Sequence, residues 1–327
     1  MEPLLQVEKL NIAFKSDHGG IFSAVSDIDF NIYKGESVGI VGESGCGKSV
    51  TAMSIMRLLK EPPAVVSGKI IFEDRDIRSL SQSQLRSLRG NEIAMIFQEP
   101  MTSLNPVYTC GKQISEAIIR HQKVSKAEAR KMTIDILRMV GIPSPEQRID
   151  EYPHQLSGGM RQRIMIAIAL SCHPKLLIAD EPTTALDVTI QAQILELIKD
   201  LKDRLDMSMI LITHDLGVVA EMTKRVIIMY AGEIVEEANV KDIFKNPCHP
   251  YTKGLLASIP RLNEKKEVLD VIEGVVPSPG SMPKGCRFGP RCSECMEKCK
   301  EQAPYAVEVA KDHYARCWLL ADAQEKG

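Results

Sequence analysis

The chain has 327 residues, of which 44% are hydrophobic and 26% are charged, and its formal net charge is −2. This length allows a sizeable core with two or three structural units, and the composition is that of an ordinary globular protein. The small net charge gives no general reason to expect nucleic-acid binding. The most apolar region, residues 164–174, is far shorter than the roughly 20 residues that cross a bilayer. The amino terminus lacks the basic start and apolar run of a signal peptide, so we expect no membrane span and a cytoplasmic location.

A complete P-loop occupies residues 42–49, which read Gly-Glu-Ser-Gly-Cys-Gly-Lys-Ser. The apolar, β-branched run at residues 38–41 predicts a buried strand before it, and the apolar face of residues 50–60 predicts a helix after it. In this context Lys48 places a charge near the β- and γ-phosphates, and the Ser49 hydroxyl can hold Mg²⁺. We therefore predict a site for ATP and Mg²⁺. Its expected contacts are Gly42, Ser44, Gly45, Cys46, Gly47, Lys48, Ser49 and Val50.

A second apolar run, residues 176–179, ends in Asp180 and Glu181. Beside a P-loop, Asp180 can bind the metal through its water shell, and Glu181 can orient and deprotonate the attacking water. The pattern alone fits an ordinary strand end with solvated acids equally well. Together with the P-loop it predicts hydrolysis of a nucleoside triphosphate.

Residues 156–163 read Leu-Ser-Gly-Gly-Met-Arg-Gln-Arg and precede a helix-like apolar run. A Ser-Gly-Gly turn that opens a helix presents N–H groups at the positive end of the helix dipole, which makes a second anion site. With both sites, the sequence resembles the ATP-binding cassette family, whose signature motif serves an ATP held by the opposite subunit. Met160 stands where the family usually has Gln, but the contacting Ser157 and Gly159 are intact.

Three further motifs of this family occur in the family's order. Gln98 matches the Q-loop, whose amide reaches Mg²⁺ and the attacking water. Residues 184–187 match the D-loop, with Thr184 where the family more often has Ser and with Asp187 available to cross the dimer interface. His214 matches the switch histidine that contacts the γ-phosphate. The resemblance therefore implies catalytic roles for Glu181, His214 and Gln98, and Mg²⁺ binding by Ser49, Gln98 and Asp180.

An aromatic residue upstream of the P-loop is expected to stack on adenine, because a flat ring gives contact area without a base-specific hydrogen bond. Phe14 stands near the family's aromatic position, but the insertion-like residues 16–20 leave Phe22 as a competitor. Either ring could belong to the core instead.

Helical patterns dominate residues 111–150. Ser125 and Glu128 form a capping box, apolar residues recur at 129, 132, 136 and 139, and Gly141 ends the pattern. This predicts a helical insertion between the Q-loop and the signature motif. In the family, such a subdomain moves relative to the core and receives coupling helices from membrane subunits.

Residues 246–260, with the Cys-His-Pro-Tyr sequence near their start, resemble a tail specific to ATPase subunits of dipeptide and oligopeptide importers. The resemblance implies an ATPase subunit that powers peptide import through partner permeases by ATP-driven dimerisation of cassettes. The same subfamily includes importers of nickel and other small solutes. A soluble cassette ATPase that acts on ribosomes or DNA is the other alternative.

Five of the nine cysteines cluster near the end of the chain, at positions 286, 292, 295, 299 and 317. Cytoplasmic thiols are kept reduced, so a cluster of them is better explained by a metal than by disulfides. The spacing alone fits zinc and an iron–sulfur cluster equally well, and the absence of any metal is the third alternative. The family's tail pattern resembles Cys286, Cys292, Cys299 and Cys317, leaves Cys295 over, and favours a [4Fe–4S] cluster.

The expected fold class is α/β: an ABC-type nucleotide-binding domain with a P-loop core, a mixed sheet and a helical subdomain, plus a small metal-binding C-terminal segment. We expect the cassette over residues 1–255, its helical subdomain over about 100–165, and the importer-specific tail over 256–327. The implied partners are a second ABC ATPase subunit, identical or paralogous, two transmembrane permease subunits and, indirectly, an extracytoplasmic peptide-binding protein. No nucleic acid is expected, and the implied location is peripheral, at the cytoplasmic face of the cell membrane.

Overall fold

The computed structural model describes residues 2–16, 20–98, 103–184, 186–259, 271–278 and 280–324. The chain divides into two compact units. Unit 1 comprises residues 1–4, 32–36 and 79–211, and unit 2 comprises residues 5–31, 37–78 and 212–327.

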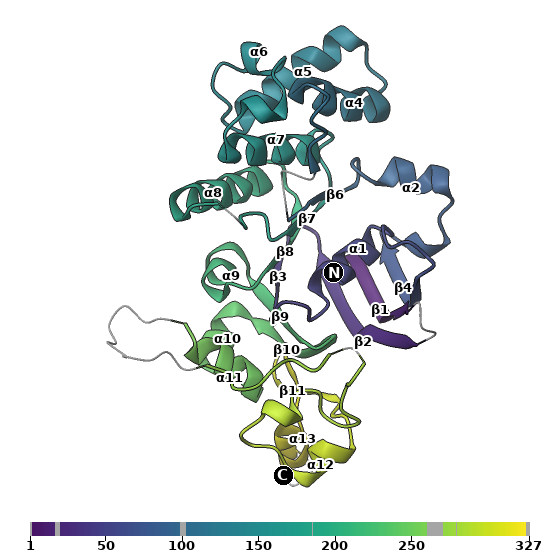
Figure 1. The fold of residues 1–327 in the computed structure, drawn as a ribbon, viewed down its shortest axis with the longest axis vertical. Coiled ribbons are helices and arrows are strands. Elements are labelled where there is room, and N and C mark those ends of the chain that lie inside the picture. Colours follow the sequence, from purple (N-terminus) through teal and green to yellow (C-terminus); the bar gives the residue numbers. More distant parts are fainter. Residues whose placement is uncertain are drawn as a thin grey trace. The chain divides into compact units, whose positions relative to one another are not determined.

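Two sets of paired strands lie largely within unit 2 (Figure 1). The first has the order β2 (Ile21–Tyr33), β1 (Pro3–Lys15), β4 (Ala64–Phe72) and β5 (Arg75–Asp76). In the second, β3 (Ser37–Val41) pairs in parallel with β9 (Arg225–Tyr230). Antiparallel pairs then lead from β9 to β10 (Glu233–Asn239), β12 (His313–Arg316) and β11 (Ala306–Ala310). The parallel and antiparallel pairs together confirm the predicted mixed sheet.

Strand β3 leads into the P-loop, and all five of its residues are buried, as the apolar run predicted. The helices described in unit 2 are α1 (Lys48–Ile55), α9 (Leu216–Met222), α10 (Val240–Lys245), α11 (Pro250–Ala257), α12 (Glu297–Glu301) and α13 (Trp318–Gln324), with the 3₁₀ turn η3 (Gly289–Arg291). Helix α1 is shorter than the predicted helix over residues 50–60. It ends at Ile55 because Arg57 has a positive φ of 48°, a backbone conformation that a helix cannot continue through.

Unit 1 contains the parallel pair β6 (Ile93–Ile96) and β7 (Leu176–Asp180), with Ile93 opposite Leu176. Strand β8 (Ser208–Thr213) begins in unit 1 and ends in unit 2. The 3₁₀ turn η1 (Ile77–Ser79) begins in unit 2, and its last residue belongs to unit 1. The remaining elements described in unit 1 are α2 (Gln82–Leu88), α4 (Cys110–Gln122), α5 (Lys126–Met139), α6 (Pro145–Arg148), η2 (Pro153–Gln155), α7 (Gly158–Leu170) and α8 (Val188–Arg204).

Helices α4, α5 and α7 pack on one another, which agrees with the predicted helical insertion (Figure 1). Helix α5 begins with the predicted capping box: the Ser125 hydroxyl accepts from Glu128 N, and the Glu128 carboxylate accepts from Ser125 N. Its predicted apolar stripe is wrong at one end, since Met139 is 37% exposed. Thr133 and Leu137 are buried instead, because with Ala129 and Ile136 they follow the i, i+4, i+7, i+8 spacing of one helix face, and Met139 lies at the edge of that face.

The part of the chain that follows α10, called the C-terminal region below, shares a core with β9 of unit 2. The Tyr230 ring packs edge to face against Tyr251 of α11, with centroids 4.7 Å apart, and against Phe288, with centroids 5.2 Å apart. Such aromatic pairs stabilise a core beyond the area that they bury. These rings belong to one buried cluster with Val41 at the end of β3 and Ile228 of β9. The segment that contains the cysteines is therefore anchored on the strands that carry the P-loop.

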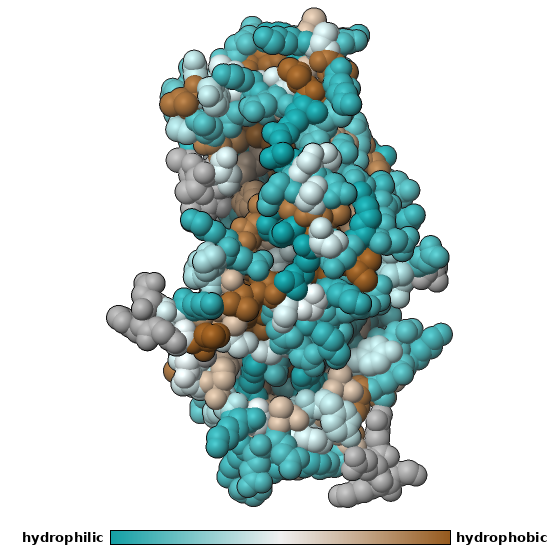
Figure 2. Space-filling model, turned by 90° about the vertical axis from the view of Figure 1, so that its right-hand side faces the viewer, coloured by the Kyte–Doolittle hydropathy of each residue, from teal (hydrophilic) through white to brown (hydrophobic). Residues whose placement is uncertain are grey.

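None of the described helices is long and apolar enough to cross a membrane. One face of the molecule is mainly hydrophilic, with smaller apolar patches between the hydrophilic residues (Figure 2).

Candidate ATPase site

The P-loop wraps around the side chain of Lys48. Its ammonium donates to the carbonyls of Gly42 at 2.8 Å and Glu43 at 3.0 Å, and the residue is only 5% exposed. Ser44 and Gly45 are exposed at the tip of the loop, whereas Cys46 is fully buried. Ser49 and Val50 follow in the first turn of α1. The predicted phosphate contacts thus line one loop and one helix N-terminus.

Two glycines of the loop are required by close backbone packing. Gly47 precedes α1 with a φ of 101°, and a Cβ there would lie 2.9 Å from a methyl group of Val25 and 3.0 Å from the Ala24 carbonyl oxygen. A Cβ on Gly42 would lie 2.1 Å from the carbonyl oxygen of Met229. The loop therefore fits between β2 and β9 only with glycine at these positions.

The two candidate adenine-stacking rings lie together. Phe14 of β1 and Phe22 of β2 are stacked, with centroids 5.9 Å apart and an interplanar angle of 27°. Both rings are half-buried. Residues 17–19 of the predicted insertion lie outside the described residues.

The predicted general base is held by two of the other predicted motifs, all within unit 1. Glu181 follows β7 directly and has a φ of 45°, which is uncommon for a residue with a side chain. Its Oε2 accepts from Gln98 Nε2 at 3.1 Å and from Thr184 Oγ1 at 2.9 Å. Asp180 is the last residue of β7 and is 5% exposed. The structure thus brings the Q-loop glutamine and the D-loop threonine onto the carboxylate of Glu181.

The signature motif opens α7, and the D-loop opens α8. The Ser157 hydroxyl caps α7 by accepting from Met160 N, and Asp187 Oδ1 caps α8 by accepting from Ile190 N at 3.0 Å. A Cβ on Gly159 would lie 3.0 Å from a methyl group of Ile190, so α8 sits close to the start of α7. Ala185 of the D-loop lies outside the described residues.

Gln162 is a site residue that the sequence analysis missed. Its side chain is buried and donates to the Pro182 carbonyl, directly after Glu181. This bond ties the signature helix to the turn that carries the predicted base. In the sequence Gln162 stands between Arg161 and Arg163, so no local pattern marks it as buried.

His214 lies in unit 2, exposed between β8 and α9. The next residue, Asp215, caps α9, because its Oδ1 accepts from Gly217 N at 2.7 Å and from Val218 N at 3.3 Å. This cap fixes the turn from which the His214 side chain projects.

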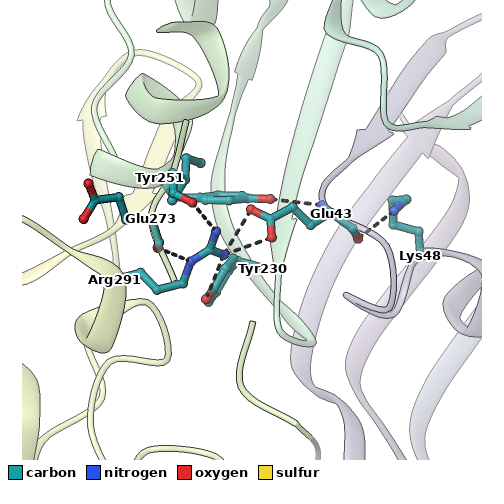
Figure 3. Close-up of polar contacts among 7 residues, drawn as sticks. Glu43, Lys48, Tyr230, Tyr251, Glu273 and Arg291 are labelled. Atoms are coloured by element: carbon teal, nitrogen blue, oxygen red, sulfur yellow. Dashed lines mark hydrogen bonds and ion pairs between the residues drawn. The ribbon is translucent and has the colours of Figure 1, made fainter. Parts of the chain in front are cut away.

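The C-terminal region contacts the P-loop at Glu43, a second feature that the sequence analysis missed (Figure 3). The Tyr251 hydroxyl accepts from Glu43 N at 3.0 Å, and Arg291 Nη1 donates to the Glu43 carboxylate at 2.9 and 3.1 Å. Glu43 and Arg291 are 248 residues apart in the chain. No local pattern in the sequence links them.

A buried carboxylate organises the start of α11. Glu236 of β10 accepts from Cys248 N at 2.7 Å, from His249 N at 2.8 Å and from His313 Nε2 at 2.8 Å. The ligand atoms of Glu236, Cys248 and His313 lie within 4.8 Å of one another. The carboxylate is already satisfied by three N–H donors, so we interpret this group as a hydrogen-bond network and not as a metal site. His249 Nδ1 in turn accepts from Tyr251 N at 3.0 Å.

The four predicted cluster ligands lie near one another in the C-terminal segment. Cys286 N donates to the Cys299 carbonyl at 2.7 Å, and Cys299 belongs to α12. Burial raises the pKa of the Cys286 and Cys317 thiols to about 11, and in both cases the nearby Cys299 thiol adds to the shift. Burial also raises the pKa of Cys292, with contributions from Cys295 and Cys299. All nine cysteines are free thiols.

The comparisons with known proteins decide the family. Residues 25–184 match the family model "ABC transporter", and residues 235–299 match "Oligopeptide/dipeptide transporter, C-terminal region". The oligopeptide transport ATP-binding protein AppD of Bacillus subtilis is 53% identical over 323 residues, which cover 98% of each chain. The chain belongs to the ATP-binding subunits of dipeptide and oligopeptide ABC transporters.

A second relative and a solved structure support this assignment. The dipeptide transport ATP-binding protein DppD of Escherichia coli is 50% identical over 319 residues, which cover 98% of this chain and 97% of that protein. Among solved structures, a dimeric, ADP- and phosphate-bound ATP-binding cassette, MJ0796, superposes with a TM-score of 0.65 at 28% identity. The superposition covers 72% of this chain and 98% of the MJ0796 chain. The ABC nucleotide-binding fold predicted from the motifs is thereby confirmed.

Proposed function

We propose that the chain is the ATP-hydrolysing subunit of an importer for di- or oligopeptides. The observation that carries this proposal is a complete set of ATPase motifs in the same chain as the oligopeptide/dipeptide C-terminal region. Its relatives are similar over almost their whole length and are named for peptide transport. The names of these relatives do not favour the alternative functions, which are import of nickel or another small solute and action on ribosomes or DNA.

Each predicted site residue has a definite role in this proposal. Lys48 and the loop N–H groups hold the phosphates, while Ser49, Gln98 and Asp180 hold Mg²⁺. Glu181 is the general base, and the Gln98 amide, which donates to its carboxylate, orients it toward water. His214 contacts the γ-phosphate. The other proposed nucleotide contacts are Phe14, Gly42, Ser44, Gly45, Cys46, Gly47, Val50, Ser157, Gly159 and Asp187.

The proposed partners follow from ATP-driven dimerisation. Two solved structures that the chain resembles, both of the cassette MJ0796, are dimeric. We propose a second cassette, identical or paralogous, which shares each ATP with this chain, and two permease subunits at the cytoplasmic face of the membrane. Binding of ATP closes the cassette dimer, and hydrolysis opens it. Peptide selectivity then resides in the permeases and an extracytoplasmic binding protein.

Purification of the intact complex from membranes tests this function. We expect the chain to co-purify with two permeases, and we expect peptide-loaded binding protein to stimulate ATP hydrolysis in proteoliposomes. Nickel and other small solutes serve as the control substrates. Co-purification with ribosomes or nucleic acid, without permeases, would contradict the proposal.

We also propose that Cys286, Cys292, Cys299 and Cys317 hold a [4Fe–4S] cluster. The residues fit such a group: Cys286 precedes η3, Cys292 follows it, Cys299 lies in α12 and Cys317 precedes α13, in a segment with only a small core cluster of its own. When bound, the cluster would cross-link these parts of the segment.

Anaerobic purification tests the cluster. The protein is expected to be brown and to contain iron and acid-labile sulfide, and replacement of Cys292 or Cys299 by Ser is expected to bleach it. Cys295→Ser is the matched control, because it removes a neighbouring thiol that is left over from the predicted ligand set. Stoichiometric zinc without iron, or bleaching by Cys295→Ser, would contradict the assignment.

A further inference from the structure

Glu43 of the P-loop is held at both its backbone and its side chain by residues from the C-terminal region of unit 2 (Figure 3). The Tyr251 hydroxyl accepts from its N–H at 3.0 Å, and Arg291 donates to both carboxylate oxygens. The Glu43 carbonyl accepts from Lys48 Nζ at 3.0 Å. The residue that helps to place the phosphate-binding lysine is therefore itself placed by Tyr251 and Arg291.

Arg291 is fixed by contacts that do not involve the P-loop. Its Nε donates to the Glu273 carbonyl at 2.9 Å, and its Nη2 donates to the Ile272 carbonyl at 3.0 Å. Its Nη1 also lies 3.4 Å from the Tyr230 hydroxyl. The Arg291 side chain is only 5% exposed, whereas that of Glu43 is 28% exposed. A guanidinium held this way needs little ordering to bind the carboxylate, so it can act as a rigid support.

The charge of this support matters as much as its position. ATP brings several negative charges to the loop, and a carboxylate in the same loop would repel them, since like charges disfavour each other over a few ångströms. Arg291 pairs with that carboxylate through a charge-assisted contact to both oxygens. The pair leaves the loop close to neutral apart from Lys48.

We propose that Arg291, together with Tyr251, is a positioning residue of the ATP site and acts through Glu43. The segment just before Cys292 thereby sets the affinity of the P-loop for nucleotide. This inference rests on the ATPase activity proposed above. It depends on neither the identity of the imported solute nor the metal at the cysteines.

The test compares Arg291→Gln with a matched control, Arg287→Gln, by steady-state ATP hydrolysis of the full-length protein. Arg287 lies in the same segment and is 13% exposed, and its Nε pairs with Glu233 at 3.1 Å while its Nη2 donates to Ser26 at 2.7 Å. It therefore anchors the same segment without contacting Glu43. We expect Arg291→Gln to raise the KM for ATP by about tenfold with kcat changed less than about threefold, because ground-state and transition-state phosphate contacts weaken together. Arg287→Gln is expected to change the KM for ATP less than about threefold. It is expected to lower the thermal unfolding midpoint by about as much as Arg291→Gln does.

A double variant separates positioning from folding. Glu43→Gln removes the carboxylate that Arg291 neutralises, so Arg291→Gln in that background is expected to add less than about a threefold rise in KM. Tyr251→Phe removes only the acceptor for Glu43 N and is expected to raise KM by about threefold without unfolding the protein.

Three results would overturn the inference: an unchanged KM in Arg291→Gln, an equal rise in Arg287→Gln, or a full tenfold effect that persists beside Glu43→Gln. Absence of ATP hydrolysis in the unmodified protein would instead refute the proposed function. The two failures are thus distinguishable.

Discussion

At the scale of single residues, the carboxylate of Glu181 is held by both its backbone and its hydrogen-bond partners. It follows a buried strand, adopts a left-handed backbone conformation, and accepts from two side chains. Such backbone conformations persist where the surrounding structure determines them, and they are common in active sites. The hydrogen bonds of Gln98 and Thr184 keep the carboxylate in one orientation.

Glu181→Gln is predicted to lower kcat for ATP hydrolysis by about 100-fold or more, because a general base is worth at least that much. An amide oxygen can still accept from Gln98 and Thr184, so ATP binding and the shape of the turn are expected to persist. Hydrolysis rates and equilibrium binding of ATP measure the two effects. Lys48→Ala is the contrasting variant: it is expected to weaken ATP binding itself, because it deletes a charge that contacts phosphate in the ground state. Near-normal turnover in Glu181→Gln would remove Glu181 from the role of base.

At the scale of elements, the start of α11 depends on a neutral histidine. His249 is 1% exposed, its Nδ1 accepts from Tyr251 N, and burial lowers its pKa to about 3. In an unfolded chain the same side chain titrates near pH 6.5. Between about pH 6.5 and pH 3 the unfolded state therefore binds a proton that the folded state does not. The stabilising contribution is present above this window and is lost as the pH falls.

His249→Asn is predicted to flatten the acid side of the stability profile. Asparagine can cap α11 through its side-chain oxygen but does not titrate. The thermal unfolding midpoint of the wild type is expected to fall more between pH 7 and pH 5 than that of the variant, since one such group changes stability by up to about 1.4 kcal/mol per pH unit. Identical pH profiles for the two proteins would show that His249 is not the group responsible.

The elements also show what the sequence could and could not predict. The capping box of α5 and the buried strand β3 were predictable, because caps and buried runs depend on residues close in the chain. The early end of α1 was not, because it is a Schellman turn in which Arg57 N donates to the Ser54 carbonyl and Leu58 N to the Met53 carbonyl, and Arg57 occupies the left-handed position that usually holds glycine. The contact between Glu43 and Arg291 was also beyond reach, since it joins residues from distant parts of the chain and is fixed only when the core around Tyr230 has formed.

At the scale of the whole molecule, the proposed machinery is divided between the two units. Unit 1 contains Glu181 and the signature motif, and unit 2 contains the P-loop and His214. If the signature motif serves an ATP on the partner's P-loop, a variant of one motif can be complemented by a variant of the other. The oligomer is then the smallest complete enzyme.

Mixing Lys48→Ala and Ser157→Arg chains is predicted to restore ATP hydrolysis that neither variant shows alone. Each mixed dimer keeps one composite site with an intact P-loop and an intact signature serine. Each variant assayed alone is the control. The measurement is the rate of ATP hydrolysis at equal total protein. An ATP-bound structure with Ser157 beside the nucleotide of its own chain would contradict the prediction.

The support of the P-loop from the C-terminal region bears on how these ATPases can be recombined. A chimaera that joins the cassette, residues 1–255, of one relative to the tail, residues 256–327, of another separates Glu43 and Tyr251 from the Arg291 with which they are matched. Tail exchange would then alter the response to ATP even if the junction lay in an exposed loop and every catalytic residue were kept. Grafts that carry Glu43, Tyr251 and Arg291 from one parent should avoid this, so the useful unit of exchange is a set of contacts and not a contiguous stretch of chain.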